Sequence, residues 1–244
     1  MLSSIEVSAI VGVCLVALAK LCTVIFPRLI YRRMSLGSLR SKVSTIGHRG
    51  SRHEGATENT LASFKEALAA GVDVIELDVW LSKDKQIVIF HDKTFSRMTN
   101  EKCASVPYEL DYAEFPVLVE PVPGHPAQYT ERERTCVPLL TEVLSITPPN
   151  VCMIIEFKQD SDELICAVAQ LVTEKDRQDK TFWFSLNDRI NTKLRRFDSR
   201  IPTICSEIGM LKILFFYYIG ILPFVSIPDA VFGVTAEEVS VTRS

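Results

Sequence analysis

The stretch VIELDVWLSKDKQIVIFHD, Val74–Asp92, decides the fold of this chain. Two β-rich runs, Val74–Leu81 and Gln86–Phe90, flank a turn-like SKDK tetrapeptide, so we expect two adjacent strands. Glu76 and Asp78 are two residues apart in the first run, which puts their side chains on the same face of the strand. Two carboxylates on a buried strand are costly without compensation, and a hard divalent cation supplies it through oxygen ligands.

Apolar runs of strand length alternate with helical patterns on both sides of this stretch. In the segment ENTLASFKEALAA, for example, apolar residues recur at helical spacing before Gly71 ends the pattern. This alternation predicts βαβ units and a parallel sheet, hence an α/β fold. The expected strands are Val43–Gly47, Val74–Leu81, Gln86–Phe90, Cys152–Phe157, Thr181–Leu186 and Pro202–Ser206, and the expected helices are Glu58–Ala70, Ser161–Arg177 and Asp188–Phe197.

The pattern fails between Asp92 and Leu139, where six prolines interrupt it. Such a long excursion from a scaffold either shapes a pocket beside the catalytic mouth or is a mobile surface loop. Both interpretations stay open at the level of sequence.

Polar residues cluster where the expected strands end. His48 and Arg49 follow the first strand in the motif IGHRG, whose glycines allow a close approach of the backbone to a ligand. His91 ends the strand IVIFHD, and Glu156 and Lys158 share one face in IIEFK. A single histidine or carboxylate at a strand end more often has a structural role than a catalytic one. In a parallel barrel, however, the carboxyl ends of successive strands meet at one site. Their convergence therefore predicts an active site.

The spaced pattern HRGxxxxxxxENTLxSFxxAxxxGxDxxELDVxLxKDxxxVxxHD, read from His48 to Asp92, resembles the signature of the glycerophosphodiester phosphodiesterase family. The resemblance continues more weakly through the PLL tripeptide at 138–140 and the IEFK segment. It implies a TIM-type (β/α)8 barrel, a divalent metal ion (Mg²⁺ or Ca²⁺) and hydrolysis of a phosphodiester to a phosphomonoester and an alcohol.

The resemblance also implies roles for individual residues. Glu76, Asp78 and Glu156 match the metal ligands of the family, and Asn59 would contact these ligands rather than the metal ion itself. His91 matches a position that is placed in the metal shell in some descriptions of the family, so it is expected there as well as in catalysis.

His48 and His91 match the acid and base of the family, and Arg49 and Lys158 match positions that face the phosphate. This assignment agrees with the chemistry of the side chains. Cations neutralise charge on the non-bridging oxygens, and imidazole suits proton transfer near neutral pH. Which histidine is the acid and which the base is open, as is the nucleophile, water or a neighbouring glycerol hydroxyl.

Residues 1–42 differ in composition from the rest of the chain. Val7–Phe26 is apolar apart from Lys20 and close to the ~20 residues that cross a bilayer. The following segment to Lys42 holds five basic and no acidic residues, which predicts a cytosolic catalytic domain and is compatible with the endoplasmic reticulum membrane. We expect a transmembrane or membrane-anchoring helix; a buried or surface-lying helix is the alternative.

A second apolar stretch, Ile208–Ile227, is uninterrupted only over Ile213–Val225, which is short for a membrane span. It is either a hydrophobic lip that dips into one leaflet or a core helix. Together with the N-terminal segment, it resembles the membrane-associated subgroup of the family that acts as a lysophospholipase D. Membrane lipid is therefore an expected partner.

The overall composition excludes several classes. Net charge −3, from 27 basic and 30 acidic residues, gives no electrostatic footprint for nucleic acid. The 47% hydrophobic content excludes a disordered chain. Seven cysteines without a CxxC pair predict free thiols, and no protein partner is implied.

The 244 residues predict one barrel domain over 43–234, with the apolar insertion at 208–227 and a polar tail at 235–244. We find no seventh or eighth strand after Pro202–Ser206, so the barrel is expected to be truncated after about six strands. The favoured function is release of the headgroup alcohol from lysophospholipids, leaving lysophosphatidic acid. The alternatives are an inactive membrane isoform acting by interaction and a sphingolipid-directed phospholipase D on the same barrel.

Overall fold

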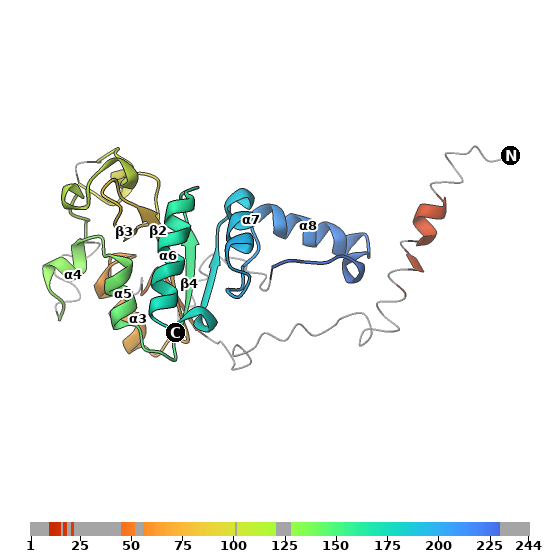
Figure 1. The fold of residues 1–244 in the computed structure, drawn as a ribbon, viewed down its shortest axis with the longest axis horizontal. Helices are drawn as coiled ribbons and strands as arrows, with labels where there is room; N and C mark the ends of the chain where they lie inside the picture. Colours follow the sequence, from red (N-terminus) through yellow and green to blue (C-terminus); the bar gives the residue numbers. More distant parts are fainter. Residues whose placement is uncertain are drawn as a thin grey trace, which may run out of the picture.

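The computed structural model describes residues 10–15, 17–18, 21, 45–51, 56–100, 102–120 and 128–229. Its centre is one β-sheet with helices packed against it (Figure 1). The strands are β1 (Ile46–His48), β2 (Val74–Leu81), β3 (Ile87–Ile89), β4 (Cys152–Phe157) and β5 (Thr181–Phe184).

The sheet is parallel along the order β1-β2-β4-β5, and β3 pairs antiparallel with β2. Its register sets which side chains meet, because His48 lies opposite Glu76 and Asp78 lies opposite Glu156. The predicted parallel α/β sheet is therefore confirmed, and the strands that carry the predicted site residues are direct neighbours.

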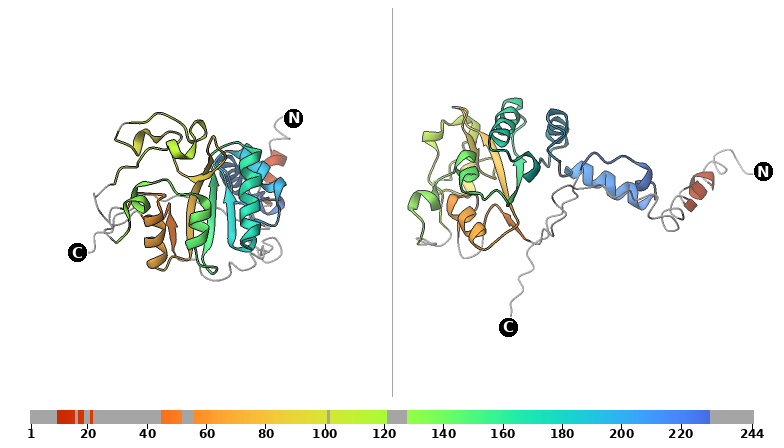
Figure 2. Two further views of the ribbon diagram at one scale, coloured as in Figure 1. Left: turned by 60° about the vertical axis from the view of Figure 1, so that its left-hand side comes forward. Right: turned by 60° about the horizontal axis from the view of Figure 1, so that its bottom comes forward.

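Helices cover one face of the sheet, where α3, α5 and α6 lie in a row (Figure 2, left). The α-helices are α3 (Leu61–Ala69), α4 (Glu131–Thr135), α5 (Leu140–Ile146), α6 (Asp162–Glu174), α7 (Asp188–Phe197) and α8 (Glu207–Tyr218). The 3-10 helices are η3 (Phe95–Arg97), η4 (Pro107–Glu109), η5 (Tyr112–Glu114), η6 (Gln178–Lys180) and η7 (Leu222–Phe224).

The main core fills the space between this face and the helices. Ile75, Leu77 and Val79 of β2 point into it, so the alternation along the strand leaves Glu76 and Asp78 on the other face. Each fully buried aliphatic side chain stabilises the fold by about 1.5–3 kcal/mol relative to exposure. This packing fixes the direction in which both carboxylates point.

Helix α3 begins later than the sequence pattern predicts. Asn59 has φ +57°, outside the helical region, and the side chain of Thr60 caps the helix by accepting a hydrogen bond from the Ser63 amide. The two residues before Thr60 therefore stay outside the helix, where Asn59 is available to the site.

The proline-rich excursion builds a second core of its own. Phe95 packs against Phe90 and Phe115 at ring-centroid distances of 4.6 and 5.0 Å, and Trp80 and Val88 close the cluster from the sheet. The described part of the excursion is thus an ordered cap over β2 and β3, with Tyr108 and Arg97 at the rim of the site.

The last predicted strand, Pro202–Ser206, is reduced to a single parallel bridge between Trp183 and Thr203. Buried Asn191 holds this segment in place, since its side chain accepts from the Ser185 amide at 3.1 Å and donates to the Ile204 carbonyl at 2.8 Å. Within the described residues the sheet is open, with β1 at one edge.

The predicted N-terminal anchor lies largely outside the described residues. Among the described residues we find no helix whose length and apolar character would suffice to cross a bilayer. Among the described cysteines, Cys14, Cys103, Cys136, Cys152 and Cys166 are free thiols.

Replacing Asn191 by Ala should lower the free energy of unfolding by about 1–3 kcal/mol, because a buried amide and a buried carbonyl lose their partner. Urea denaturation measures this change. The matched control is Arg189→Ala on the same helix, whose side chain is mostly exposed and whose ion pair contributes less than about 1 kcal/mol. Equal losses in the two variants would contradict the role given to Asn191.

Candidate active site

Three carboxylates converge on the open face of the sheet. Glu76 and Asp78 come from β2 and Glu156 from β4, and all three are buried. One oxygen from each lies within 4.8 Å of the others. The arrangement follows from the register, which aligns Asp78 with Glu156 across two parallel strands.

Burial is the main cause of the unusual protonation of this cluster. It raises the pKa of Glu76 well above its usual value, and the charges of Asp78 and Glu156 raise it further. Burial also raises the pKa of Glu156 to about 7, although neighbouring Lys158 opposes the shift. The cluster therefore carries more negative charge than its surroundings accommodate, and it takes up either protons or a cation.

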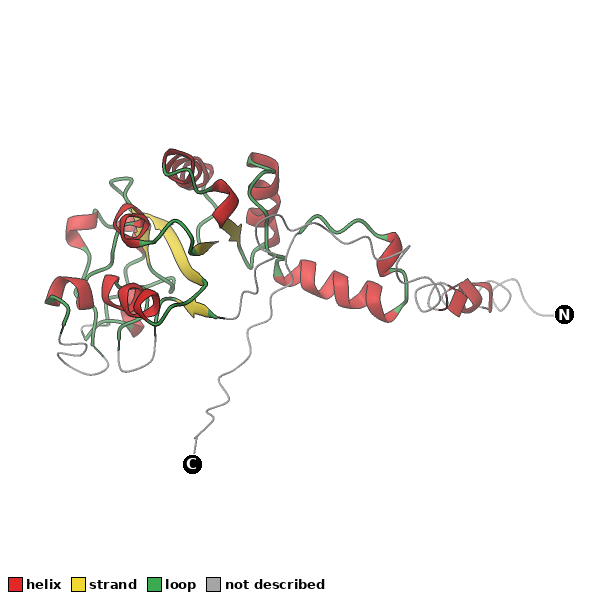
Figure 3. Ribbon diagram, turned by 90° about the horizontal axis from the view of Figure 1, so that it is seen from below, coloured by secondary structure: helices red, strands yellow, loops and turns green. Residues whose placement is uncertain are grey.

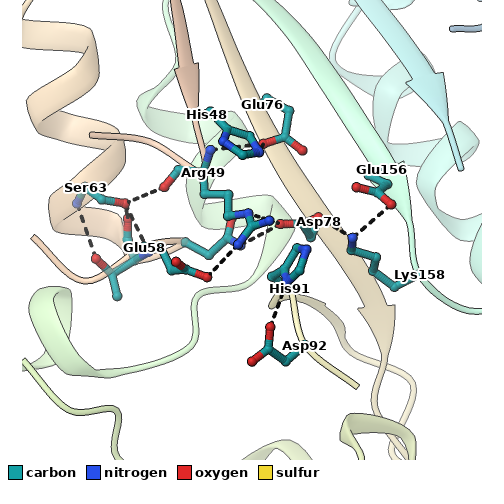
Figure 4. A network of polar contacts seen from close by, with 12 residues as sticks. His48, Arg49, Glu58, Ser63, Glu76, Asp78, His91, Asp92, Glu156 and Lys158 are labelled. Atoms are coloured by element: carbon teal, nitrogen blue, oxygen red, sulfur yellow. Dashed lines mark hydrogen bonds and ion pairs between the residues drawn. The ribbon is translucent and has the colours of Figure 1, made fainter. Parts of the chain in front are cut away.

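Asp78 is the ionised member of the cluster. Burial alone would raise its pKa, but Lys158 and His91 outweigh burial, aided by a hydrogen bond from Asn59, so the pKa lies below its usual value. The Lys158 ammonium lies 3.1 Å from Asp78 Oδ1 and 2.8 Å from Glu156 Oε1 (Figure 4). Asn59 Nδ2 donates to Asp78 Oδ2 at 2.8 Å, the supporting role that the resemblance implies.

The loop after β1 holds Arg49 against the cluster. Its amide donates to Glu76 Oε2 at 3.0 Å, and its Nε lies 3.7 Å from Asp78 Oδ2. Both Arg49 and Asn59 have positive φ, and the Asn59 amide donates to the Arg49 carbonyl at 2.9 Å. Strained backbone of this kind concentrates at functional sites.

The two glycines of the IGHRG motif make room for helix α3. A Cβ at Gly47 would lie 2.9 Å from the Ala67 side chain, and one at Gly50 would lie 2.4 Å from Ser63 Oγ. The space that they free is therefore taken by helix α3, and a close approach of the backbone to a ligand at these glycines stays a prediction.

The two predicted histidines lie in different surroundings. His48 is almost half exposed, and its Nε2 lies 3.8 Å from Glu76 Oε2. His91 Nδ1 lies 2.6 Å from Asp92 Oδ1, and its ring lies beside Asp78 in Figure 4. The carboxylate favours the proton on Nδ1, which leaves Nε2 as the basic nitrogen.

Two residues that the sequence analysis did not assign complete the network. Arg97 donates to Asp92 Oδ2 at 2.6 Å and to Glu58 Oε1 at 2.5 Å, and Glu58 also accepts from Arg49 at 3.0 Å. Glu58 belongs to the quoted ENT triplet, which was a usable signal. Arg97 lies in the excursion, where no periodic pattern marks it.

A second group of potential metal ligands is formed by Glu58, His91 and Asp92. Arg97 bridges its two carboxylates and already supplies their counter-charge. The structure thus groups His91 with these residues, and its coordination of a metal ion stays a prediction.

A cavity of about 410 Å³ opens next to the carboxylates. Its walls join strand residues with the excursion, whose Tyr108 lies 6.3 Å from Trp80 between ring centroids. This position supports the interpretation that the excursion shapes a substrate pocket. The lining residues are Trp80, His91, Lys93, Tyr108, Lys158, Gln159 and Asp160.

The carboxylate cluster fits a divalent cation in its chemistry. It offers oxygen donors alone, which Mg²⁺ and Ca²⁺ prefer, and two of its members have raised pKa values that a nearby positive charge would relieve. The cluster also lies beside two cations, Lys158 and Arg49, and two histidines, His48 and His91. Such groups suit cleavage of a phosphodiester, because its negative charge must be neutralised and its leaving alkoxide must be protonated.

Comparison with known proteins agrees with this geometry. The sequence of this chain matches the model of the glycerophosphoryl diester phosphodiesterase family over residues 48–210. The chain belongs to this family.

The relatives include lysophospholipase D GDPD1 of Mus musculus, 34% identical over 211 residues, or 86% of this chain and 65% of that protein. Lysophospholipase D GDPD3 of Mus musculus is 31% identical over 78% of this chain and 57% of its own length. The chain thus spans less than two thirds of these curated relatives.

Among solved structures, a phosphodiesterase from Oleispira antarctica in complex with the product sn-glycerol-3-phosphate is 27% identical, with a TM-score of 0.57. The match covers 71% of this chain and 70% of that one. The expected family membership is therefore confirmed.

The cluster predicts a cation effect that grows with pH. Above about pH 4.5 the folded chain keeps protons on Glu76 and Glu156 that the unfolded chain has released, and on Glu156 it does so up to about pH 7, so stability without cation falls as pH rises through this window. Above that window Mg²⁺ or Ca²⁺ should add about 3 kcal/mol at a concentration about 100 times Kd. Thermal unfolding with and without cation measures the difference.

The double variant Glu76→Gln, Glu156→Gln should lose both the cation effect and the fall in stability with pH. Glu163→Gln is the control, because Glu163 is an exposed carboxylate of α6 and lies outside the cluster. An unchanged cation effect in the double variant would place the binding site elsewhere.

Proposed function

We propose that this protein hydrolyses glycerophosphodiesters in a divalent-metal-dependent reaction, with lysophospholipids as the substrate class. The observation that carries the proposal is the buried cluster of Glu76, Asp78 and Glu156 beside two cations and two histidines. Few structural roles require three buried carboxylates on adjacent strands, because their burial is costly.

Each residue has a defined task in this proposal. Glu76, Asp78 and Glu156 would hold Mg²⁺ or Ca²⁺, which when bound supplies charge neutralisation at the non-bridging oxygens. Arg49 and Lys158 add fixed positive charge on the same side.

The two histidines handle protons. His91, held through Nδ1 by Asp92, presents Nε2, and His48 lies at the exposed edge next to Glu76. One removes the proton from the nucleophile and the other protonates the leaving alkoxide. Arg97 keeps Asp92 ionised and in place, which preserves the orientation of His91.

The substrate class is supported by the relatives. Two curated relatives are named lysophospholipase D, and the Oleispira antarctica structure holds sn-glycerol-3-phosphate as product. On a lysophospholipid the proposed reaction releases the headgroup alcohol and leaves lysophosphatidic acid. We also propose that the catalytic domain lies on the cytosolic face of a membrane, as the basic segment before Lys42 suggests.

His48→Gln should lower the rate of choline release by about 100-fold or more, because it removes one proton-transfer group. The rate is measured as choline released from glycerophosphocholine and from lysophosphatidylcholine. Choline release from sphingomyelin is measured separately to test the sphingolipid alternative. The cation-dependent rise in Tm should persist in the variant, which shows that folding and cation binding are intact.

A chain that binds cation but releases no choline from glycerophosphocholine or lysophosphatidylcholine would contradict the proposal. That result would favour the alternative of an inactive membrane isoform that acts by interaction. Choline release from sphingomyelin alone would favour the alternative of a sphingolipid-directed phospholipase D.

A further inference from the structure

An apolar hairpin formed by residues 207–228 projects from the domain. Helix α8 runs outward, Gly220 turns the chain at φ +77°, and η7 begins the return (Figures 1 and 3). Both ends are fastened. Ser206 caps α8 and donates to Asp188 at 2.6 Å, and buried Asp229 accepts from Arg195 at 2.7 Å.

The hairpin is apolar on its exposed surface. No residue of α8 is buried, and only Glu207 and Lys212 are charged between 207 and 228. Within the described residues, α8 is therefore not a core helix. The most exposed large side chains are Leu211 62%, Phe215 60%, Tyr217 61%, Tyr218 70% and Phe224 63%.

We propose that the apolar hairpin inserts into the surface of a lipid bilayer and holds the catalytic site against it. A protein groove covers one stripe of a helix, which would then show an amphipathic pattern. Here apolar side chains occupy successive positions, as in the run ILFFYYIGIL, so one flat protein surface would leave part of them in water. Lipid surrounds an inserted element on all sides.

The length of α8 indicates insertion without spanning. Its 12 residues extend about 18 Å at 1.5 Å per residue, short of the ~30 Å hydrocarbon core. The chain then returns to Asp229 on the side from which it left.

Two exposed basic side chains near the hairpin, Arg196 and Lys212, can contact an anionic lipid surface. The other basic residues between Asp188 and Tyr218 form ion pairs with carboxylates: Arg189, Lys193, Arg195 and Arg200. Arg196 and Phe197 at the end of α7 are exposed. Each basic side chain near an anionic surface adds about 1 kcal/mol to binding, so the proposal includes a preference for acidic phospholipid.

A tryptophan reporter tests insertion independently of the predicted N-terminal anchor. The chain has two tryptophans, Trp80 and Trp183, and both are buried. Phe215→Trp places a third in the hairpin. Val117→Trp is the control, because Val117 is equally exposed and belongs to the excursion, which Figure 1 shows in yellow to yellow-green at the opposite end of the domain from α8.

We expect vesicles of brominated phosphatidylcholine and phosphatidylserine to quench the Phe215→Trp variant at least about twice as strongly as the control, since bromine quenches only within the bilayer. Vesicles without phosphatidylserine should quench less. Equal quenching of the two variants would overturn the proposal. Emission that is already blue-shifted without lipid would also overturn it. A shift that depends on protein concentration would favour a second copy as the occupant, and one that does not would favour another segment of this chain.

The consequence for catalysis rests on the proposed function. The variant Leu211→Ser, Phe215→Ser, Tyr218→Ser should lose about tenfold or more of its activity on lysophosphatidylcholine in vesicles and keep its activity on soluble glycerophosphocholine. Equal losses of activity on both substrates would contradict the claim that the hairpin holds the catalytic site against the bilayer. If the unaltered chain cleaves neither substrate, the proposed function fails, while the quenching result still decides insertion.

Discussion

The repulsion among three buried carboxylates is the constraint on which the rest of this site depends. Glu76, Asp78 and Glu156 share one small volume because the register of β2 and β4 aligns them. The hydrophobic effect enforces that register, since a slip of one residue would turn Ile75 and Leu77 out of the core. The fold thus stabilises a cluster that is unfavourable by itself.

The surrounding residues are arranged to offset this charge only in part. Lys158 and Arg49 face the cluster, and Asn59 fixes Asp78 from the loop before α3. Despite these contacts, the pKa values of Glu76 and Glu156 lie above their usual range. A site with residual negative charge and adjacent fixed cations is suited to hold a divalent cation and a phosphodiester together.

Much of this arrangement could be predicted from sequence because it follows the period of two along β2 and the ends of parallel strands. Glu76, Asp78 and Glu156 obey that rule. Arg97 could not be found in this way, because the excursion has no period and its position depends on the packing around Phe95. The packing of α3 against Gly47 and Gly50 could not be predicted either, because it depends on tertiary contacts that no sequence period marks.

The apolar hairpin would bring this chemistry to a lipid surface, and the chemistry itself depends on where the metal ion binds. The most direct measurement is anomalous diffraction from crystals grown with Mn²⁺, a stand-in for Mg²⁺ or Ca²⁺. The account predicts one peak coordinated by Glu76, Asp78 and Glu156. A peak at Glu58, His91 and Asp92 instead, or none at the three buried carboxylates, would contradict it.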